Sequence, residues 1–391
     1  MTIHLKYGGS TAARTIQCPA WHRLAEEVPF TLDGGANVAA DTGTMLHNCM
    51  ETIYSVDDYM DDPFYAIGEL LEEGVHYNNQ HLTPELVKEK LKPAVTAVED
   101  LLESLDISDW KCEPFVKIDD DIGGSIDMLG ISDDKKTVLI LDYKFGYNSV
   151  AVEGNKQLQF YALAAATDPS TRDWFDTCDT IVLAVIQPNE DGDDLQTWEI
   201  SMEQLDDFET EYLAAVDKAE DPKTQPNSGF NCKFCPAMAT CPVKTGEALK
   251  ASRMPEIAAE KLAEYLPLAE DVIEWAKEVQ KIAHQQLELG TPIKGYKLVN
   301  KRATRTWNDI EAVEDKVRKS KKIKMEDGFD FKLKSPAQME KVCKEKGVPF
   351  KQFEEYVSAI SSGTTLAKES DKRPAAVPVQ GLAQLNAMTQ E

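Results

Sequence analysis

The chain has 391 residues, of which 42% are hydrophobic, and a formal net charge of −26 at pH 7; this length accommodates about two or three structural units. The charge argues against a nonspecific coat on nucleic acid, because neutralising phosphates requires Lys and Arg. No apolar run approaches the roughly 20 residues of a membrane helix and the N-terminus lacks the apolar centre of a signal peptide, so we expect a cytoplasmic protein without membrane spans.

The first predicted element is a short helix at residues 20–27, which follows Cys18 and Pro19. A buried structural thiol so near a chain end has little core to fill. Eight cysteines in a chain without a secretion signal favour metal ligands or buried thiols over a disulfide framework. Cys18 is therefore a candidate metal ligand.

Two longer helices are predicted next. The first begins at residues 42–44 and carries His47, although a lone helical His is on spacing alone more often a core or surface residue than a ligand. The second runs over residues 83–104, with Thr83 as a plausible N-cap before Pro84. The N-terminal part of the chain is therefore expected to be mainly helical.

Three strands are predicted to follow these helices. Residues 110–118 form the first strand, and Glu113 on it is expected to be an edge-strand charge, with support of a metal site as the alternative. Residues 123–131 and 137–141 form a hairpin, because branched and apolar residues flank the polar turn at residues 132–136.

The predicted hairpin register brings two acids together. If the turn is centred between Asp134 and Lys135, Asp127 lies directly opposite Asp142. Directly paired side chains have Cβ atoms about 4.5–5.5 Å apart, where like charges repel, so this register favours a cation between them. Lys144 shares a strand face with Asp142. Two acids and a Lys at one point can hold a hard divalent metal beside a water and a phosphate; the alternative is a surface hairpin with scattered charges.

A helix at residues 155–166 follows the hairpin. Gln157 and Tyr161 lie four positions apart on it, so they face the same way. Three further elements are predicted: a strand buried on both faces at residues 180–187, a strand at 195–200 and a helix at 202–219. The order of elements predicts an α/β fold with a central mixed sheet flanked by helices.

A cysteine-rich loop follows the sheet. Cys232, Cys235 and Cys241 have the spacing C-x2-C-x5-C in a segment flanked by Gly and Pro. Three cysteines this close in an intracellular protein are typical of metal ligands, and a four-ligand site needs one more thiolate from elsewhere in the chain. On ligand chemistry, both zinc and a [4Fe–4S] cluster remain open.

The C-terminal part has a different character. Two helices are predicted at residues 255–266 and 267–289, each with Pro in its first turn. Lys and Arg outnumber Asp and Glu within residues 291–346, where Arg302, Arg305 and Trp307 would suit a phosphate-and-stacking contact with DNA. A surface strand with a half-buried Trp explains these residues equally well. The chain from residue 362 onward reads as a disordered tail.

The spaced motifs resemble the RecB/AddB-type nucleases of the PD-(D/E)XK superfamily. The matching residues are Gly124-x-x-Asp127, Asp142-x-Lys144 and Gln157-x-x-x-Tyr161, which occur in this order, together with Gly43-x-x-x-His47. AddB-type nucleases and the iron–sulfur nucleases of CRISPR adaptation also place one Cys before the core and C-x2-C-x5-C after it. Cys18 and the later triplet match that arrangement, which implies a [4Fe–4S] cluster that joins the two segments.

The resemblance implies a restriction-endonuclease-like core that hydrolyses DNA. His47, Asp127 and Asp142 would hold Mg²⁺ or Mn²⁺, Lys144 would orient the attacking water or stabilise the developing charge, and Gln157 and Tyr161 would position the phosphate or the Lys. GYKLV followed by R-x-W, with SPAQMEK further on, is similar to a group of phage and prophage RecB-like nucleases. That similarity implies a DNA exonuclease of phage replication or recombination in the host cytoplasm, with a single-strand annealing or binding protein as its candidate partner.

The predicted layout has five parts, and its oligomeric state is left open. They are a helical N-terminal segment at residues 1–109, the nuclease core at 110–220, the cysteine-rich clip at 221–250, a partly basic C-terminal extension at 251–361 and the tail at 362–391. The alternatives to a cluster-bearing nuclease are an inactive DNA-binding or scaffold protein of the same fold, and a nuclease with structural zinc in place of the cluster.

Overall fold

The computed structural model describes residues 5–28, 38–146, 148–188, 194–252, 262–288 and 290–297, and residues 344, 349 and 351. The chain divides into two compact units, Met1–Val299 and Asn300–Glu391, and almost all described residues belong to the first. The predicted DNA contacts Arg302, Arg305 and Trp307, and the predicted tail, lie outside the described residues. The predicted boundaries of the five parts stay predictions.

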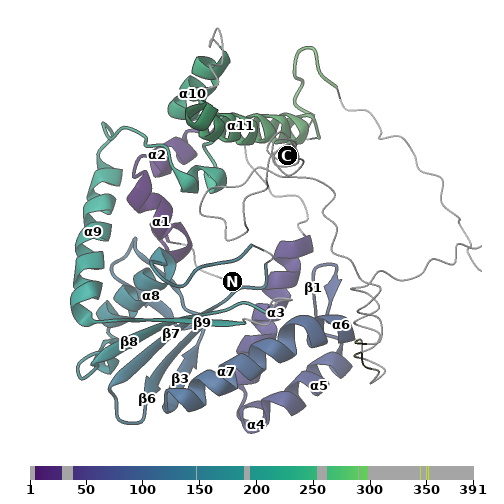
Figure 1. Cartoon of the computed structure of the whole chain (residues 1–391), viewed down its shortest axis with the longest axis vertical. Coiled ribbons are helices and arrows are strands. Elements are labelled where there is room, and N and C mark those ends of the chain that lie inside the picture. The colour runs from purple at the N-terminus through teal and green to yellow at the C-terminus, as the bar shows by residue number, and fades with distance from the viewer. Residues whose placement is uncertain are drawn as a thin grey trace, which may run out of the picture. The chain divides into compact units, whose positions relative to one another are not determined.

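A five-stranded mixed sheet forms the centre of the first unit (Figure 1). In sheet order its strands are β3 (Ile107–Cys112), β6 (Met128–Ser132), β7 (Thr137–Tyr143), β8 (Thr180–Ile186) and β9 (Leu195–Ile200). The pair β7–β8 is parallel and the other neighbouring pairs are antiparallel. The predicted fold class, a central mixed sheet flanked by helices, is confirmed.

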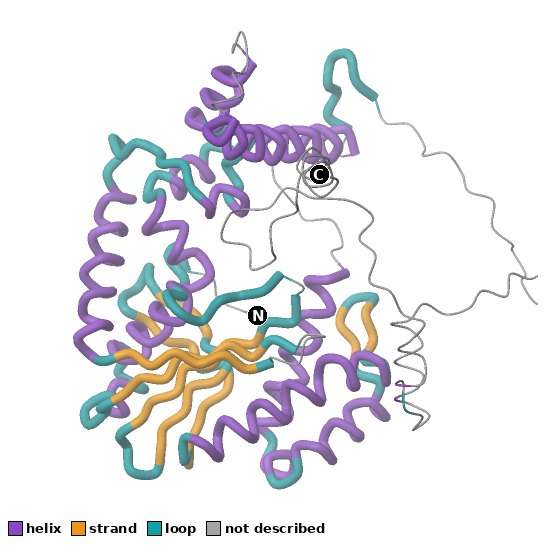
Figure 2. Tube along the Cα trace, viewed as in Figure 1, coloured by secondary structure: helices purple, strands orange, loops and turns teal. Residues whose placement is uncertain are grey.

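Helices cover both faces of this sheet (Figure 2). Alternate residues of β7 are buried in two separate cores. Leu139 and Leu141 face one core, which is covered by α3 (Val38–Ser55), α5 (Pro63–Glu73) and α7 (Lys92–Ser104). Val138 and Ile140 face the other core, which is covered by α8 (Lys156–Thr167) and α9 (Met202–Glu220). Successive strand residues point to opposite faces, so Asp142 is directed toward the α8 side.

The hairpin β6–β7 has the predicted register. Met128 pairs with Leu141 and Ile131 with Val138, so the positions of Asp127 and Asp142 oppose each other at its open end. Lys135 adopts a left-handed conformation at φ +60° in the turn. The Ser132 hydroxyl accepts a hydrogen bond from the backbone N–H of Thr137 at 2.9 Å, which closes the turn.

Two strands that were predicted to be continuous are each broken, and this prediction is corrected. β3 ends before Glu113, β4 (Phe115–Lys117) pairs with β5 (Gly123–Ser125) in a separate ribbon, and β6 begins only at Met128. Glu113 has φ +49°, and Pro114 after it has no N–H for a ladder. The ribbon therefore bends at this point, where Glu113 N–H donates to the Asp127 carbonyl at 3.2 Å.

Helix α1 (Gly9–Gln17) lies where no helix was predicted. Before it, the Tyr7 backbone pairs with the segment that enters β5: Tyr7 N–H donates to Asp121 O, and Gly123 N–H donates to Tyr7 O, both at 3.0 Å. Gly9 then passes so close to α8 that a Cβ atom there would lie 2.5 Å from Tyr161 Cε1. The glycine is required by this close approach, and it fixes α1 against the helix that carries Tyr161.

Two predicted helix boundaries are wrong. α3 already begins at Val38 instead of residue 42. α11 (Leu262–Glu288) is one helix that continues through Pro267, where two helices were predicted. A proline removes one backbone donor and can bend a helix without ending it. Here α11 packs against α10 (Pro242–Ser252), and the ion pair of Lys244 with Asp271 at 3.0 Å joins the two helices one turn after Pro267.

The remaining elements are short. They are α2 (Trp21–Glu26), α4 (Asp57–Met60), the hairpin β1 (His76–Tyr77) and β2 (Gln80–His81), α6 (Pro84–Leu86), a π-helical turn (Val87–Leu91), and the 3-10 turns Arg172–Trp174 and Phe230–Phe234. In the described part of the chain, no helix combines the length and apolar character needed to span a bilayer.

We expect opposite effects on stability from two Gly-to-Ala substitutions. Gly123→Ala should lower the free energy of unfolding by about 1–3 kcal/mol, because its Cβ would lie 2.6 Å from the Val116 carbonyl in the β4–β5 ribbon. Gly68→Ala should raise it by about 0.5–1 kcal/mol, because Gly68 lies inside α5 with open space around it. Urea unfolding measures both, and a Gly123→Ala variant as stable as the wild type would contradict the close approach.

Candidate active site

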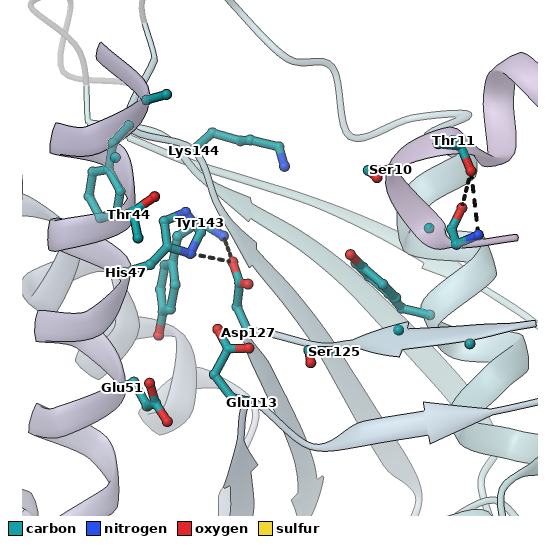
Figure 3. A pocket seen from close by; sticks show the side chains of 18 of the residues that line it. Ser10, Thr11, Thr44, His47, Glu51, Glu113, Ser125, Asp127, Tyr143 and Lys144 are labelled. Carbon is teal, nitrogen blue, oxygen red and sulfur yellow. Dashed lines mark hydrogen bonds and ion pairs between the residues drawn. The ribbon is translucent and has the colours of Figure 1, made fainter. Parts of the chain in front are cut away.

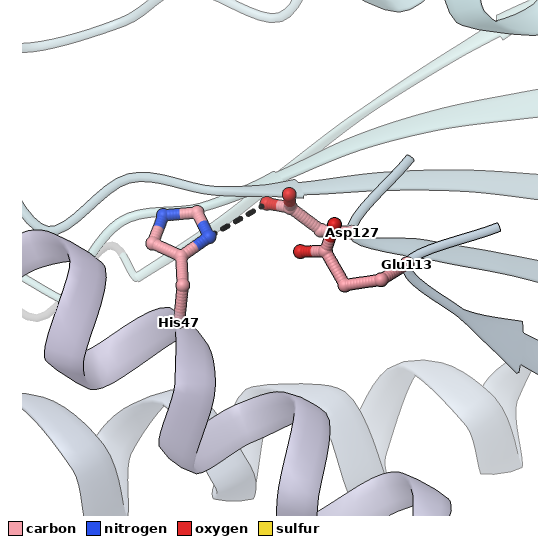
Figure 4. Close-up of side chains that lie close together, drawn as sticks. All are labelled: His47, Glu113 and Asp127. Carbon is pink, nitrogen blue, oxygen red and sulfur yellow. Dashed lines mark ion pairs between the residues drawn. The ribbon is translucent and has the colours of Figure 1, made fainter. Parts of the chain in front are cut away.

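Three side chains from separate elements converge at the bend of the ribbon. His47 comes from α3, Glu113 from the residue after β3 and Asp127 from the residue before β6 (Figure 4). One ligand atom of each lies within 4.8 Å of the others, and His47 Nδ1 is 3.4 Å from Asp127 Oδ2. One imidazole nitrogen and two carboxylates at this spacing are a suitable donor set for a divalent metal.

Glu113 is the one member of this trio that was not predicted to be a metal ligand. It was expected to be an edge-strand charge, with support of a metal site as the alternative, and the structure puts its carboxylate beside Asp127. The left-handed conformation of Glu113 ends the strand and turns the side chain inward. The signal in the sequence was Pro114, because a Pro after a strand residue marks a break in the ladder.

A second group joins the end of β7 to α8. Lys144 Nζ lies 2.5 Å from Asp142 Oδ2 and donates to Gln157 Oε1 at 3.3 Å. Gln157 Nε2 in turn donates to Asp142 Oδ1 at 2.9 Å and to the Tyr161 hydroxyl at 3.1 Å. The four residues that the sequence analysis proposed from two separate motifs therefore form one connected network.

The two groups meet at Asp127 and Asp142. Asp127 Oδ2 accepts a hydrogen bond from the backbone N–H of Tyr143 at 2.5 Å. Asp142 is only 3% exposed, and its buried Oδ2 is in ion-pair contact with the Lys144 ammonium at 2.5 Å. Asp142 lies outside the compact trio of His47, Glu113 and Asp127. It remains a predicted ligand.

Burial and crowding of negative charge shift the titration of these groups. Burial, and then the charge of Asp127, raise the pKa of Glu113 to about 7. Burial also raises the pKa of Asp142, which Lys144 opposes and Asp127 reinforces. Burial alone would lower the pKa of His47, but Asp127 and Asp142 together outweigh it and the net shift is upward. A divalent cation would relieve this crowding.

A cavity of about 950 Å³ opens over these residues. Figure 3 shows His47, Glu113 and Asp127 on one side of it, Ser10 and Thr11 of α1 on the other, and Lys144 reaching in from the hairpin. Its wall contains both cations and acids, which are Lys6, Lys144, Glu51, Glu113 and Asp127. The cavity is thus large enough for a polymer segment, and its acidic members lie together at the candidate metal group.

The four cysteines that were predicted to be ligands line a second, small cavity. Cys18, before α2, lies across it from Cys232, Cys235 and Cys241 of the later loop, so segments more than two hundred positions apart meet there. Two backbone N–H groups donate to sulfur, Asn227 to Cys18 at 3.2 Å and Gly229 to Cys232 at 3.4 Å. Burial raises the pKa of the Cys18 thiol, and the Asn227 donor opposes this shift only in part.

Two basic side chains border the cysteine cavity. Lys244 is 2% exposed and is neutralised by Glu247 and Asp271, each at 3.0 Å. Arg14 stacks over the Trp21 ring at 4.6 Å, and its buried Nε atom has no hydrogen-bond partner. Trp21 lines both cavities, so the cysteine cavity and the larger cavity are neighbours.

A family model described as "Protein of unknown function (DUF2800)" matches residues 4–374. The chain belongs to this family. Among solved structures it is similar to an alkaline exonuclease (LHK-Exo) from Laribacter hongkongensis, at 11% identity over 45% of this chain and 86% of the other, with a TM-score of 0.23. It is also similar to the protein SSO0001, at 12% identity over 57% of this chain and 94% of the other, with a TM-score of 0.24.

We expect binding of Mn²⁺ to this member of the DUF2800 family to weaken as the pH falls below about 7, because Glu113 must lose its proton to act as a ligand and its pKa is about 7. Glu113→Gln should weaken Mn²⁺ binding roughly tenfold or more at pH 8. It should also make the pH dependence shallower. Isothermal titration calorimetry between pH 5.5 and 8 measures both effects.

Glu51→Gln is the matched control for this prediction. Glu51 lines the same cavity but is not part of the trio with His47 and Asp127. Its substitution should leave the affinity at pH 8 nearly unchanged, while loss of its charge lowers the pKa of Glu113 and so moves the pH dependence to slightly lower pH. Equal losses in the two variants would mean that the general negative charge of the cavity binds the ion.

Proposed function

We propose that this protein is a divalent-metal-dependent deoxyribonuclease that hydrolyses phosphodiester bonds. The proposal is carried by two groups of side chains that lie next to each other beside a large cavity. One is the trio of His47, Glu113 and Asp127, and the other is the ion pair of Asp142 with Lys144. A cluster of acids that favours a cation, beside a fixed ammonium group, suits a substrate with a negatively charged reacting centre.

Mg²⁺ or Mn²⁺ fits the donor set better than a softer ion. His47, Glu113, Asp127 and Asp142 would hold it, and oxygen donors predominate among them. The burial of Asp142 supports this assignment, because its carboxylate is crowded by the charge of Asp127 and is costly to ionise without further positive charge. A bound divalent ion in such a site lowers the pKa of a water ligand and offsets charge on a phosphate.

Lys144 is the side chain that would act directly on the reacting groups. Its ammonium group would donate to the attacking water or to a non-bridging phosphate oxygen, which stabilises charge that develops in the transition state. Gln157 holds Lys144 and Asp142 at the same time, and Tyr161 fixes Gln157 from the next turn of α8. These contacts orient Lys144 before substrate arrives, so less reorganisation is needed on binding.

The finer parts of the proposal rest on the resemblance of the sequence motifs. They are exonucleolytic action, a role in phage replication or recombination, and a single-strand annealing or binding protein as partner. The rival is a catalytically inactive DNA-binding or scaffold protein of the same fold. The connected network of Asp142, Lys144, Gln157 and Tyr161 argues against it, because a protein that only binds has no need for every member.

We also propose that the cysteine cavity holds a [4Fe–4S] cluster, with structural zinc as the alternative. The order of the cysteines supports the cluster, because one Cys before the core and C-x2-C-x5-C after it is the arrangement in the iron–sulfur nucleases that the sequence resembles. Cys18 and the later triplet line one small cavity, so four sulfurs are available to either group. Arg14, with its unpartnered Nε, would balance the charge of thiolates.

Lys144→Ala should reduce Mg²⁺-dependent cleavage of end-labelled DNA by at least about a hundredfold, because it removes the only cation that contacts Asp142 among the described residues. Metal binding should persist. Gel assays on linear and circular, single- and double-stranded DNA, with Mg²⁺, Mn²⁺ or chelator, measure the effect together with polarity.

The control for this experiment is Lys156→Ala. Lys156 is the first residue of α8 and forms an exposed ion pair with Glu211 at 2.6 Å, away from the network. Its loss should leave cleavage unchanged. Undiminished cleavage by both Lys144→Ala and Asp142→Ala would refute the proposed site.

Cys232→Ser should abolish iron binding and broad visible absorption in protein purified without oxygen, because Cys232 is one of the four cysteines around the small cavity. Cys178→Ser should retain both, since the Cys178 thiol hydrogen-bonds the Thr180 carbonyl elsewhere in the fold. Metal analysis and absorption spectra measure the outcome. Zinc in place of iron in the wild type would establish the alternative.

A further inference from the structure

Two phenylalanines beside the cysteine cavity are exposed side by side. Phe230 is 78% exposed and Phe234 is 53% exposed, and both lie on the 3-10 turn that carries Cys232. Their ring centroids are 6.5 Å apart in an edge-to-face arrangement. Lys233 Nζ lies 5.3 Å from the centroid of the Phe234 ring. The turn thus presents two aromatic rings and one cation to solvent.

The turn is held in place, so the exposure of its rings does not come from a loose loop. Asn231 N–H donates to Gln17 Oε1 at 3.0 Å, and the Asn231 side chain donates to Ala13 O at 3.2 Å. Gly229 packs so closely on the Gln17 side chain that a Cβ would lie 2.4 Å from it. The end of α1 therefore fixes the turn on the body of the protein.

The same helix joins the turn to the candidate active site. Gly9 and Ser10 at the start of α1 line the large cavity, whereas Gln17 at its end holds the turn. A helix of nine residues is about 13 Å long. Trp21 forms a wall of both cavities. A strand that leaves the active-site cavity can therefore reach the two rings within a few nucleotides.

The chemistry of the turn favours nucleobases over a protein surface. Stable protein interfaces bury about 1,200–2,000 Å², whereas two Phe side chains offer about 300–500 Å² at most. Lys233 has no ion-pair contact among the described residues, and Glu274, with which it interacts electrostatically, is paired with Lys277 at 2.9 Å. The Lys233 ammonium can therefore approach a phosphate. Bases within a duplex are already stacked on each other, and free base faces occur in single strands.

We propose that Phe230 and Phe234, with Lys233, form a stacking site for bases of single-stranded DNA next to the active-site cavity. The inference rests on the proposed function, because it takes DNA to be the substrate. The stacking site adds a preference for single-stranded over double-stranded DNA. The catalytic residues do not supply this preference, since metal and phosphate contacts are common to single and double strands. The rings would hold the strand while the adjacent phosphates reach the cavity.

The test measures binding apart from cleavage. A fluorescent (dT)20 and a 20-base-pair duplex are titrated with full-length protein in a Lys144→Ala background with Mg²⁺, and affinity is read by anisotropy. Phe230→Ser with Phe234→Ser should weaken (dT)20 binding roughly tenfold or more and change duplex binding less than twofold. Phe230→Tyr with Phe234→Tyr should restore single-strand affinity, because the ring faces are retained.

The matched control is Phe64→Ser with Tyr65→Ser on α5. These aromatic residues are 45% and 58% exposed. They lie on α5, which covers the core of α3, α5 and α7, so their loss should not change (dT)20 binding. Unchanged (dT)20 affinity in the Phe230/Phe234 double variant overturns the proposal, as does an equal loss for duplex. Unchanged affinity with loss of self-association in light scattering assigns the rings to a contact between two copies of the chain.

Failure of this inference is distinguishable from failure of the proposed function. Wild-type protein that binds (dT)20 through the two rings but cleaves no DNA refutes the nuclease and leaves the stacking site standing. Wild-type protein that cleaves DNA while the double variant binds normally refutes the stacking site alone.

Discussion

The candidate site depends on repulsion between carboxylates that the backbone forces together. Pro114 and the left-handed Glu113 end the strand pairing on one side of the ribbon, and the break between β5 and β6 does so on the other. Glu113 and Asp127 then share a small volume that has no Lys or Arg in ion-pair contact with either of them among the described residues. Without a metal ion, a bound proton is what relieves this crowding, as the raised pKa of Glu113 indicates. A cation that binds between Glu113 and Asp127 would relieve the same repulsion, so the fold favours a cation at this position.

The second half of the site is fixed by ordinary helix chemistry. The side chain of Asn155, the N-cap of α8, accepts hydrogen bonds from the backbone N–H groups of Gln157 and Leu158 at 3.0 and 3.3 Å. This cap sets where the helix begins and therefore where Gln157 points. Because β7 and α8 pack in the same core, the strand end that carries Asp142 lies against the first turn of the helix.

Local patterns predicted the elements whose geometry is set locally. The register of β6–β7 followed from turn residues and alternation, and the contact of Gln157 with Tyr161 followed from helical spacing. Glu113 could not be assigned in this way, because its role arises from a bend created by the pairing of four strand segments. Helix α1 was missed for a similar reason: it begins with Gly9 and has few apolar residues, so contacts with α8 and α9 determine it more than its own propensity does.

Helix α1 has a consequence for how this protein can be divided. Its first turn borders the active-site cavity, its last turn anchors the cysteine loop, and Trp21 just beyond it belongs to both cavities. Neither centre can therefore be transplanted or trimmed as a separate module, because any cut that removes this short segment dismantles both. Shortened versions and chimaeras built around the sheet alone would need a substitute for α1. This helix contributes few apolar residues but borders the active-site cavity and anchors the cysteine loop.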